Sequence, residues 1–223
     1  MKYTELSLMP EIQKAVERMG FVEMTEIQEK AIPVMLSSKD VIAKAPTGTG
    51  KTCAFGIPVI QAVNQAKKQP QTVILAPTRE LAQQIAGDLL DLAYFLPDIR
   101  IACLYGGANM QKQVDQLKKG CQILVATPGR LMDHVKRRTV DISAVTMVVL
   151  DEADEMLNMG FYKDVRHIID IMKARRSLSM FSATISREVM DIGWLYQRDA
   201  EEITVQPVEE SLPKIHQYKL RTT

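Results

Sequence analysis

Short, almost entirely apolar runs alternate with longer segments of helical periodicity along nearly the whole chain. Seven such runs are candidate strands, and they lie at residues 41–45, 72–76, 99–105, 122–127, 146–150, 179–182 and 202–205. Between them apolar residues recur at helical spacing, as in Ile12, Ala15, Val16 and Met19. Strands that are apolar on both faces are typical of a sheet covered by helices on both sides. The alternation therefore predicts an α/β fold with a mostly parallel central sheet and right-handed crossovers.

Length and composition limit the class of protein further. The chain has 223 residues, of which 46% are hydrophobic and 25% charged, and its formal net charge is +1. These values are ordinary for one globular domain. No apolar run approaches the roughly 20 residues that a bilayer requires, and the start lacks the layout of a signal peptide. The near-zero charge argues against coating nucleic acid by bulk electrostatics, but it permits a grip on a few phosphates.

The cysteines indicate whether the protein works in a reducing or an oxidising compartment. Cys53, Cys103 and Cys121 lie far apart, and no two of them form a CxxC pair. A sparse, odd number of cysteines argues against a disulfide framework or a zinc site. We therefore expect a protein of the reducing cytoplasm.

A glycine-containing segment follows the first candidate strand and precedes a helical stretch. It consists of Ala45, Pro46, Thr47, Gly48, Thr49, Gly50, Lys51 and Thr52. The two glycines allow a sharp turn, so that backbone N–H groups converge on phosphate oxygens at a helix N-terminus. In such a loop Lys51 reaches the β- and γ-phosphates and the Thr52 hydroxyl ligates Mg²⁺. Ala45 stands where the general pattern has glycine, and the alternative is a turn that only caps the next helix.

An acidic segment, Asp151-Glu152-Ala153-Asp154, follows the candidate strand 146–150. A carboxylate in this place is what a phosphate-loop site needs to hold Mg²⁺ through a water ligand, which is the role expected of Asp151. Glu152 is the natural general base for an attacking water, so the pair favours hydrolysis over binding alone. No Asn-Lys-x-Asp motif occurs, which favours ATP over GTP. The alternative is a solvated acidic turn at a helix N-terminus.

Together these segments resemble the amino-terminal RecA-like domain of the DEAD-box family of ATP-dependent RNA helicases. The resemblance covers essentially the whole chain, and its segments occur in the family's order and approximate spacing. They are the phosphate loop 45–52, Pro77-Thr78-Arg79-Glu80-Leu81-Ala82, Gly106-Gly107, Thr127-Pro128-Gly129-Arg130, Asp151-Glu152-Ala153-Asp154 and Ser182-Ala183-Thr184. The resemblance implies a RecA-like P-loop domain over residues 1–206 and a linker at 207–223 that leads to a second RecA-like domain.

Residues 20–28 resemble the family's adenine-recognition Q motif, and Tyr3 stands where the family usually has an isolated aromatic, most often Phe. The Gln28 amide can both donate to and accept from the adenine edge. Phe21 offers a ring that can stack on a base. Thr25 to Gln28 is also a capping box that starts the next helix, and both roles remain open here. The expected ATP site therefore includes Phe21, Thr25 and Gln28 with the phosphate loop.

By the same resemblance, an RNA track is expected from nine residues. They are Pro77, Thr78, Arg79, Gly106, Gly107, Thr127, Pro128, Gly129 and Arg130. Arginine forks and backbone N–H groups at one sheet edge can hold phosphates without reading sequence. Ser182 and Thr184 are expected to link the nucleotide site to the RNA site through Asp154. Local alternatives are an Arg79–Glu80 pair and plain turns at the glycines.

The resemblance implies the ATP-binding half of an ATP-dependent RNA helicase, with ATP and Mg²⁺ as cofactors and RNA as partner. Lys51, Asp151 and Glu152 are the expected catalytic residues. Nothing after Thr184 resembles the arginine-rich His-Arg-x-Gly-Arg segment of the family's second domain. The chain alone is therefore expected to bind adenine nucleotide, to hydrolyse ATP slowly and to unwind nothing. The alternatives are a stand-alone nucleotide-dependent RNA-binding module and another P-loop ATPase, such as a DNA helicase or a transport motor.

Overall fold

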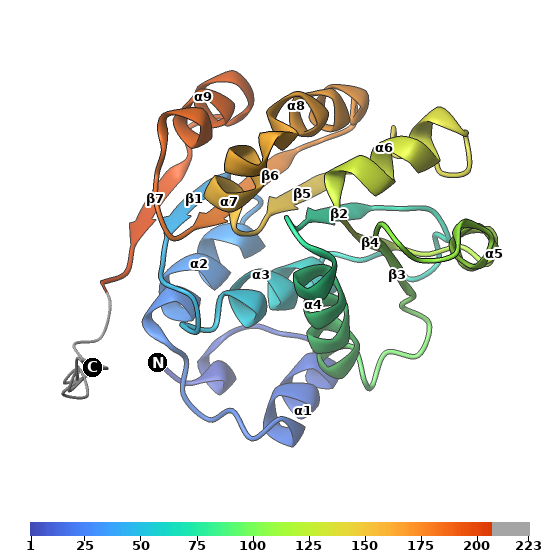
Figure 1. Cartoon of the computed structure of the whole chain (residues 1–223). Helices are drawn as coiled ribbons and strands as arrows, with labels where there is room; N and C mark the ends of the chain where they lie inside the picture. Colours follow the sequence, from blue (N-terminus) through green and yellow to red (C-terminus); the bar gives the residue numbers. More distant parts are fainter. Residues whose placement is uncertain (207–223) are drawn as a thin grey trace, which may run out of the picture.

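A parallel sheet runs through the centre of the computed structural model, which describes residues 1–206 (Figure 1). Within these residues it has seven strands in the order β3-β4-β2-β5-β6-β1-β7, and every neighbouring pair is parallel. The strands are β1 (Val41–Lys44), β2 (Thr72–Leu75), β3 (Ile101–Leu104), β4 (Ile123–Ala126), β5 (Met147–Leu150), β6 (Ser177–Ser182) and β7 (Glu201–Thr204). The predicted fold class is confirmed. The expected linker, 207–223, lies outside the described residues.

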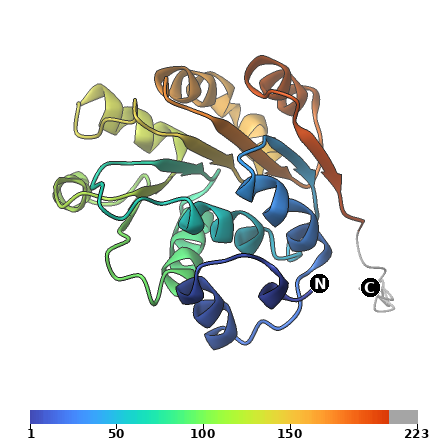
Figure 2. The same ribbon diagram turned by 180° about the vertical axis from the view of Figure 1, so that it is seen from behind.

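Helices cover both faces of the sheet, as Figures 1 and 2 show. One face carries η1 (Tyr3–Glu5), α1 (Pro10–Arg18), α2 (Glu26–Leu36), α3 (Lys51–Gln61) and α4 (Arg79–Leu92). The other carries α6 (Pro128–Lys136), α7 (Ala153–Met156), η2 (Leu157–Phe161), α8 (Tyr162–Ile171) and α9 (Arg187–Tyr196), while α5 (Met110–Lys118) packs beside β3. None of the helices in the part of the chain described is long and apolar enough to cross a membrane.

The two helical layers explain why the strands are apolar at consecutive positions. Side chains of a strand point alternately to the two faces of its sheet. In β2, Ile74 joins the core under α1–α4, whereas Val73 and Leu75 join the core under α6–α9. All three are fully buried. Both faces of a central strand therefore require apolar residues, which is the pattern that the sequence showed.

The seven expected strands are all present, but several ends differ by one or two residues. The expected strand 99–105 begins at Ile101, because the Ile99 N–H donates to the Leu96 carbonyl in a turn. The expected strand 179–182 begins two residues earlier, because Ser177 and Leu178 pair with the start of β5. These ends are decided by the neighbouring chain rather than by local sequence.

Asp40 ties together the amino-terminal edge of the sheet, just before β1. Its side chain is buried, with 4% exposure. Oδ1 accepts a hydrogen bond from the Leu178 N–H at 2.7 Å, and Oδ2 accepts one from the Arg198 N–H at 2.6 Å. One carboxylate thus satisfies two backbone donors, one at the start of β6 and one in the segment between α9 and β7.

Asp40→Ala should lower the free energy of unfolding, because it leaves both N–H groups without their acceptor. Each buried donor left unpaired costs about 1–3 kcal/mol. Equilibrium urea denaturation followed by circular dichroism measures the loss, with Asp98→Ala, at an exposed position, as the control. An Asp40→Ala midpoint equal to that of the wild type would contradict this role.

Candidate functional site

The segments that the sequence singled out meet at the carboxyl-terminal edge of the sheet. The phosphate loop follows β1, and Asp151–Asp154 follow β5. Ser182 ends β6, which lies between those two strands, and Ala183 and Thr184 come directly after it. The segments that begin at Pro77, Tyr105 and Thr127 follow β2, β3 and β4 on the same edge. Ligands of parallel α/β sheets bind at this edge. The edge therefore has one end built from β5, β6 and β1, and another built from β2, β4 and β3.

The phosphate loop has the backbone shape that its glycines were expected to allow. Gly48 and Gly50 have φ values of +83° and +88°, in the left-handed region that favours glycine. A Cβ atom on Gly50 would lie 2.5 Å from Gln28 Nε2, so a side chain there would displace the Gln28 amide. The Thr49 hydroxyl donates to the Pro46 carbonyl at 2.8 Å, and α3 begins at Lys51. The loop thus ends at a helix N-terminus, where N–H groups favour an anion.

An ion pair joins the phosphate loop to the acidic segment. Lys51 Nζ lies 2.7 Å from Glu152 Oε1, and the two side chains are only 6% and 12% exposed. The Thr47 hydroxyl donates to the same oxygen at 3.3 Å. Glu152 has left-handed backbone angles, φ 47° and ψ 52°, which are unusual for a residue with a side chain. The surroundings therefore hold the Glu152 carboxylate at the lysine in a strained conformation.

Asp151 is almost fully buried next to this pair. Burial raises the pKa of its carboxyl to about 6; Lys51 lowers the pKa, and Glu152 raises it further. Its Oδ1 accepts a hydrogen bond from the Glu152 N–H at 3.1 Å. The structure thus brings the three expected catalytic residues, Lys51, Asp151 and Glu152, to one place. A buried carboxylate here can bind a divalent cation or hold a proton.

Asp154 connects the ends of β5 and β6. Its N–H donates to Ser182 Oγ at 3.0 Å, while its Oδ2 accepts from the Thr184 N–H at 2.9 Å and the Thr184 hydroxyl at 2.6 Å. Burial by itself raises the pKa of Asp154, but its hydrogen bonds with Ser182 and Thr184 outweigh it, so the pKa lies below the usual value. Asp154 is therefore held as a carboxylate that fixes the acidic segment to the end of β6.

Gln28 serves the start of α2 and also contacts the phosphate loop. Its Oε1 accepts from the Thr25 N–H at 2.9 Å, which completes the expected capping box. Its Nε2 donates to the Gly50 carbonyl at 3.1 Å. Phe21 is 41% exposed and so remains accessible. The capping interpretation is confirmed, and the adenine-reading role of Phe21, Thr25 and Gln28 stays a prediction.

Arg79 faces the glycine pair rather than its neighbour Glu80. Its guanidinium lies 5.1 Å from the centroid of the Tyr105 ring, and a Cβ atom on Gly107 would lie 3.7 Å from Arg79 Nη1. No Arg79–Glu80 ion pair occurs in residues 1–206. Thr78 is the N-cap of α4, and its hydroxyl accepts from the Leu81 N–H. The exposed arginine thus lies over the loop that begins at Tyr105.

Arg130 also points to that loop. Its guanidinium donates to the Ala108 carbonyl at 3.1 Å, from the first turn of α6. Gly106, Gly107 and Gly129 are exposed beside it. Pro77, Thr127 and Pro128, by contrast, are buried, so their part in the site is to shape the loops. Of the nine residues expected on the RNA track, those with accessible atoms are Thr78, Arg79, Gly106, Gly107, Gly129 and Arg130.

Two buried polar residues that the sequence does not single out support this loop. His134 on α6 is fully buried, and its Nε2 donates to Gln113 Oε1 at 3.0 Å, since a carboxamide oxygen can only accept. Gln113 Nε2 in turn donates to the Tyr105 carbonyl at 3.1 Å. Burial lowers the pKa of His134, which favours its neutral form. No local pattern identifies these residues, because their partners come from three different segments.

A further residue that the sequence does not single out is Asp88 on α4, whose carboxyl lies near the Thr52 side chain. Burial raises the pKa of Asp88, and the nearby Thr52 hydroxyl lowers it, with a net rise. No cluster of three His, Cys, Asp or Glu side chains suited to a metal occurs in the described part of the chain. Any metal at Thr52 and Asp151 would take its remaining ligands from phosphate and water, as Mg²⁺ commonly does.

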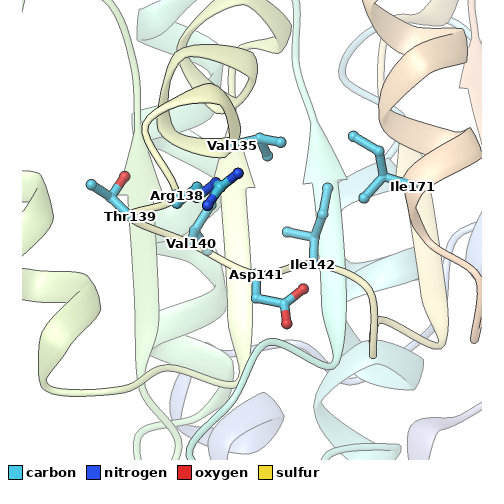
Figure 3. Close-up of a pocket in the computed structure, with 7 residues that line it drawn as sticks. All are labelled: Val135, Arg138, Thr139, Val140, Asp141, Ile142 and Ile171. Atoms are coloured by element: carbon cyan, nitrogen blue, oxygen red, sulfur yellow. The ribbon is translucent and has the colours of Figure 1, made fainter.

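A cavity of about 340 Å³ lies away from this site (Figure 3). It is lined by Val135, Arg138, Thr139, Val140, Asp141, Ile142 and Ile171. The segment 138–142 leads to the amino-terminal start of β5, and Ile171 ends the helix before β6. None of the expected site residues lines this cavity, so it belongs to the opposite edge of the sheet.

Comparisons with known proteins agree with this arrangement. The family model described as DEAD/DEAH box helicase matches residues 25–192. The chain is 44% identical over 218 residues to the DEAD-box ATP-dependent RNA helicase CshA of Geobacillus kaustophilus, covering 98% of this chain and 46% of that protein. It is 44% identical to the ATP-dependent RNA helicase CshA of Listeria monocytogenes, covering 97% of this chain and 43% of that protein. The chain therefore spans about half the length of these curated relatives.

The chain also superposes on solved structures of DEAD-box proteins. A DEAD box protein from Methanococcus jannaschii superposes with a TM-score of 0.86 at 40% identity, covering 92% of this chain and 56% of that one. The yeast DEAD-box splicing factor Prp28 superposes with a TM-score of 0.86 at 30% identity, covering 92% of this chain and 51% of that one.

Asp151→Asn should stabilise the chain in the absence of nucleotide and metal above about pH 6. Burial raises the Asp151 pKa from 3.8 to about 6, so the folded state holds a proton that the unfolded state releases. The wild type therefore loses stability as pH rises from about 4 to about 6, by about 1–3 kcal/mol in all. Asparagine carries no such charge. Thermal unfolding from pH 4 to 8 measures the difference, which should grow up to about pH 6 and then level off.

The control for this experiment is Asp98→Asn, at an exposed position. Its melting temperature should follow that of the wild type at every pH. A constant offset between Asp151→Asn and the wild type across the range would show that the carboxyl of Asp151 is not the titrating group.

Proposed function

Because the chain belongs to the DEAD/DEAH box helicase family, we propose that it is the ATP-binding half of an ATP-dependent RNA helicase. Its curated relatives are named as ATP-dependent RNA helicases. The observation that carries the proposal is the buried Lys51–Glu152 pair at the N-terminus of α3, with buried Asp151 beside it. This arrangement sets a cation, a base and a metal-binding acid around a loop shaped for phosphate.

The nucleotide lies, in this proposal, along residues 45–52, with Lys51 facing the β- and γ-phosphates. Thr52 and Asp151 would hold Mg²⁺, the latter through a water molecule. The ion supplies charge neutralisation on the phosphate oxygens. Residues 20–28 support the base, with Phe21 accessible for stacking and Gln28 at the loop. The family's ATP-dependent members support this assignment, and the geometry of the loop is compatible with it.

Glu152 acts as the general base in this scheme. Its carboxylate is held by Lys51 and by the Thr47 hydroxyl. A phosphate that takes over Lys51 releases the Glu152 oxygen, which can then accept a proton from the attacking water. Most of the rate in phosphoryl transfer comes from positioning and charge stabilisation, to which Lys51 contributes.

RNA binds, we propose, at the other end of the same sheet edge. Arg79 and Arg130 carry the positive charge there, and Gly106, Gly107 and Gly129 expose backbone atoms. Such groups grip phosphates without reading bases, which suits local duplex unwinding or remodelling of ribonucleoproteins. Asp154, Ser182 and Thr184 couple the two ends, because they fasten the segment after β5 to β6, and β5 also pairs with β2.

The domain plan and the location complete the proposal. We propose residues 1–206 as one RecA-like domain, residues 207–223 as a linker, and a second RecA-like domain beyond it, since relatives are about twice as long. Three free cysteines support a cytoplasmic location.

Two substitutions separate the proposed roles of Lys51 and Glu152. Lys51→Ala should weaken ADP binding by at least about tenfold, because a buried charge-assisted contact to phosphate is lost. Glu152→Gln should bind ADP at least as tightly as the wild type does, yet stop RNA-stimulated hydrolysis in the two-domain protein. Calorimetry measures the first effect and phosphate release the second. The control is Lys163→Ala, which removes an exposed lysine from α8 on the opposite face of the sheet. Wild-type turnover by Glu152→Gln would exclude Glu152 as the base.

The chain alone should hydrolyse ATP very slowly, and fusing a second RecA-like domain after Thr223 should raise RNA-stimulated turnover by orders of magnitude. An arginine supplied across the nucleotide is worth about 10³–10⁵ in rate. Domain closure also excludes water from the site. Steady-state ATPase rates of both proteins, with and without single-stranded RNA, measure this. Equal RNA-stimulated rates would instead indicate a self-sufficient ATPase.

A further inference from the structure

The carboxamide of Gln28 has little hydrogen-bonding capacity left for a ligand. Its Oε1 accepts from the Thr25 N–H at 2.9 Å and from the Tyr3 hydroxyl at 2.5 Å. A carboxamide oxygen has two lone pairs, so both are used. Its Nε2 donates one hydrogen to the Gly50 carbonyl at 3.1 Å. What remains is one N–H, which is a donor and not an acceptor.

Tyr3 is held firmly in the position from which its hydroxyl reaches Gln28. It lies in η1 with 4% exposure, and its ring packs in the core under α1–α4. Lys2 bridges to Glu23 in antiparallel fashion, and the Met24 N–H donates to the Met1 carbonyl. The amino terminus is also paired with Glu29 on α2. The first three residues are therefore laid against the segment 22–29, and the tyrosine hydroxyl has a fixed partner.

The Tyr3 hydroxyl also remains a donor at any ordinary pH. Burial raises the Tyr3 pKa far above its usual value, so the proton stays on the oxygen. If the hydroxyl turned away from Gln28, a buried O–H group would lose its partner, which is costly. The sequence already set Tyr3 apart, because phenylalanine, which has no hydroxyl, is the more common aromatic there in the family that this chain resembles.

We propose that Tyr3 is a specificity-determining residue: its hydroxyl occupies the Gln28 lone pair that would otherwise accept the adenine amino group, and so lowers the preference for adenine over guanine. This inference rests on the proposed nucleotide site. Adenine presents an acceptor, N7, and a donor, the N6 amino group, whereas guanine presents two acceptors, N7 and O6. A Gln28 that offers only a donor satisfies N7 of either base and leaves the adenine amino group without an acceptor.

The test is the variant Tyr3→Phe, which lacks only the hydroxyl group of Tyr3. It should bind ADP about three- to tenfold more tightly than the wild type, because the adenine amino group gains one hydrogen bond. GDP affinity should change by less than about twofold, since guanine has no donor at that edge position. The GDP to ADP ratio of dissociation constants should therefore rise. Isothermal titration calorimetry of the full chain with Mg²⁺ measures both constants, and a thermal melt of each variant reports folding.

A nucleotide that lacks the amino group makes the test independent of guanine. The 5′-diphosphate of purine riboside is ADP without N6. Wild type should bind it about as well as ADP, and Tyr3→Phe should gain affinity only for ADP. Tyr162→Phe, a tyrosine on α8 across the sheet, is the matched control and should change nothing. In a Gln28→Leu background, Tyr3→Phe should no longer alter the ratio, because the lone pair is absent.

The outcomes separate this inference from the proposed function. If the wild type binds ADP but Tyr3→Phe leaves the ratio unchanged or lowers it, the inference is overturned and the nucleotide site stands. If Tyr3→Phe weakens ADP, GDP and the purine diphosphate alike, the hydroxyl only supports the fold, and the inference is again overturned. If the wild type binds no nucleotide at all, the proposed site fails and the inference fails with it.

Discussion

The parallel direction of all the strands is the constraint on which the site depends. Because every strand in residues 1–206 runs the same way, every carboxyl end reaches the same edge. Lys51 and Glu152, separated by 101 residues in sequence, thereby become an ion pair. The strand order then sorts the loops, with those after β5, β6 and β1 at one end and those after β2, β4 and β3 at the other. The β5–β2 pairing is where the two groups of loops meet.

The sequence predicted the layers of this fold well and the strand limits less well. Apolar runs such as Val73 to Leu75 are informative because burial on both faces leaves little freedom of residue type. The start of β6 was missed because Ser177 is polar yet buried. Its place in the strand is fixed by pairing with β5, a contact with a distant segment that no local pattern encodes.

In the candidate site, too, the sequence predicted which residues carry the chemistry but not all the contacts between them. Residue types at motif spacing predicted a phosphate loop and an acidic segment, and the structure brings these two together. They did not predict that Glu152 is bound to Lys51, or that Gln113 and His134 support the loop at Tyr105. At Gln28 the sequence left a cap and a base contact as alternatives. The structure shows the cap, and by adding Tyr3 it reveals that two roles compete for one oxygen atom.

The polar groups of this edge are largely satisfied by one another, and this governs how a ligand binds. Lys51 forms an ion pair with Glu152, and Asp154 is hydrogen-bonded to Thr184 and Ser182. A phosphate that displaces Glu152 from Lys51 leaves two neighbouring carboxylates, Glu152 and Asp151, in a largely buried site, which is unfavourable unless a cation or a proton accompanies it. In the proposed enzyme, nucleotide affinity is therefore a difference between new and old contacts, and a cation that neutralised Asp151 would belong to the same binding step. Mg²⁺ and the nucleotide would then bind as one unit, and Glu152 would be free to act as a base only with both in place.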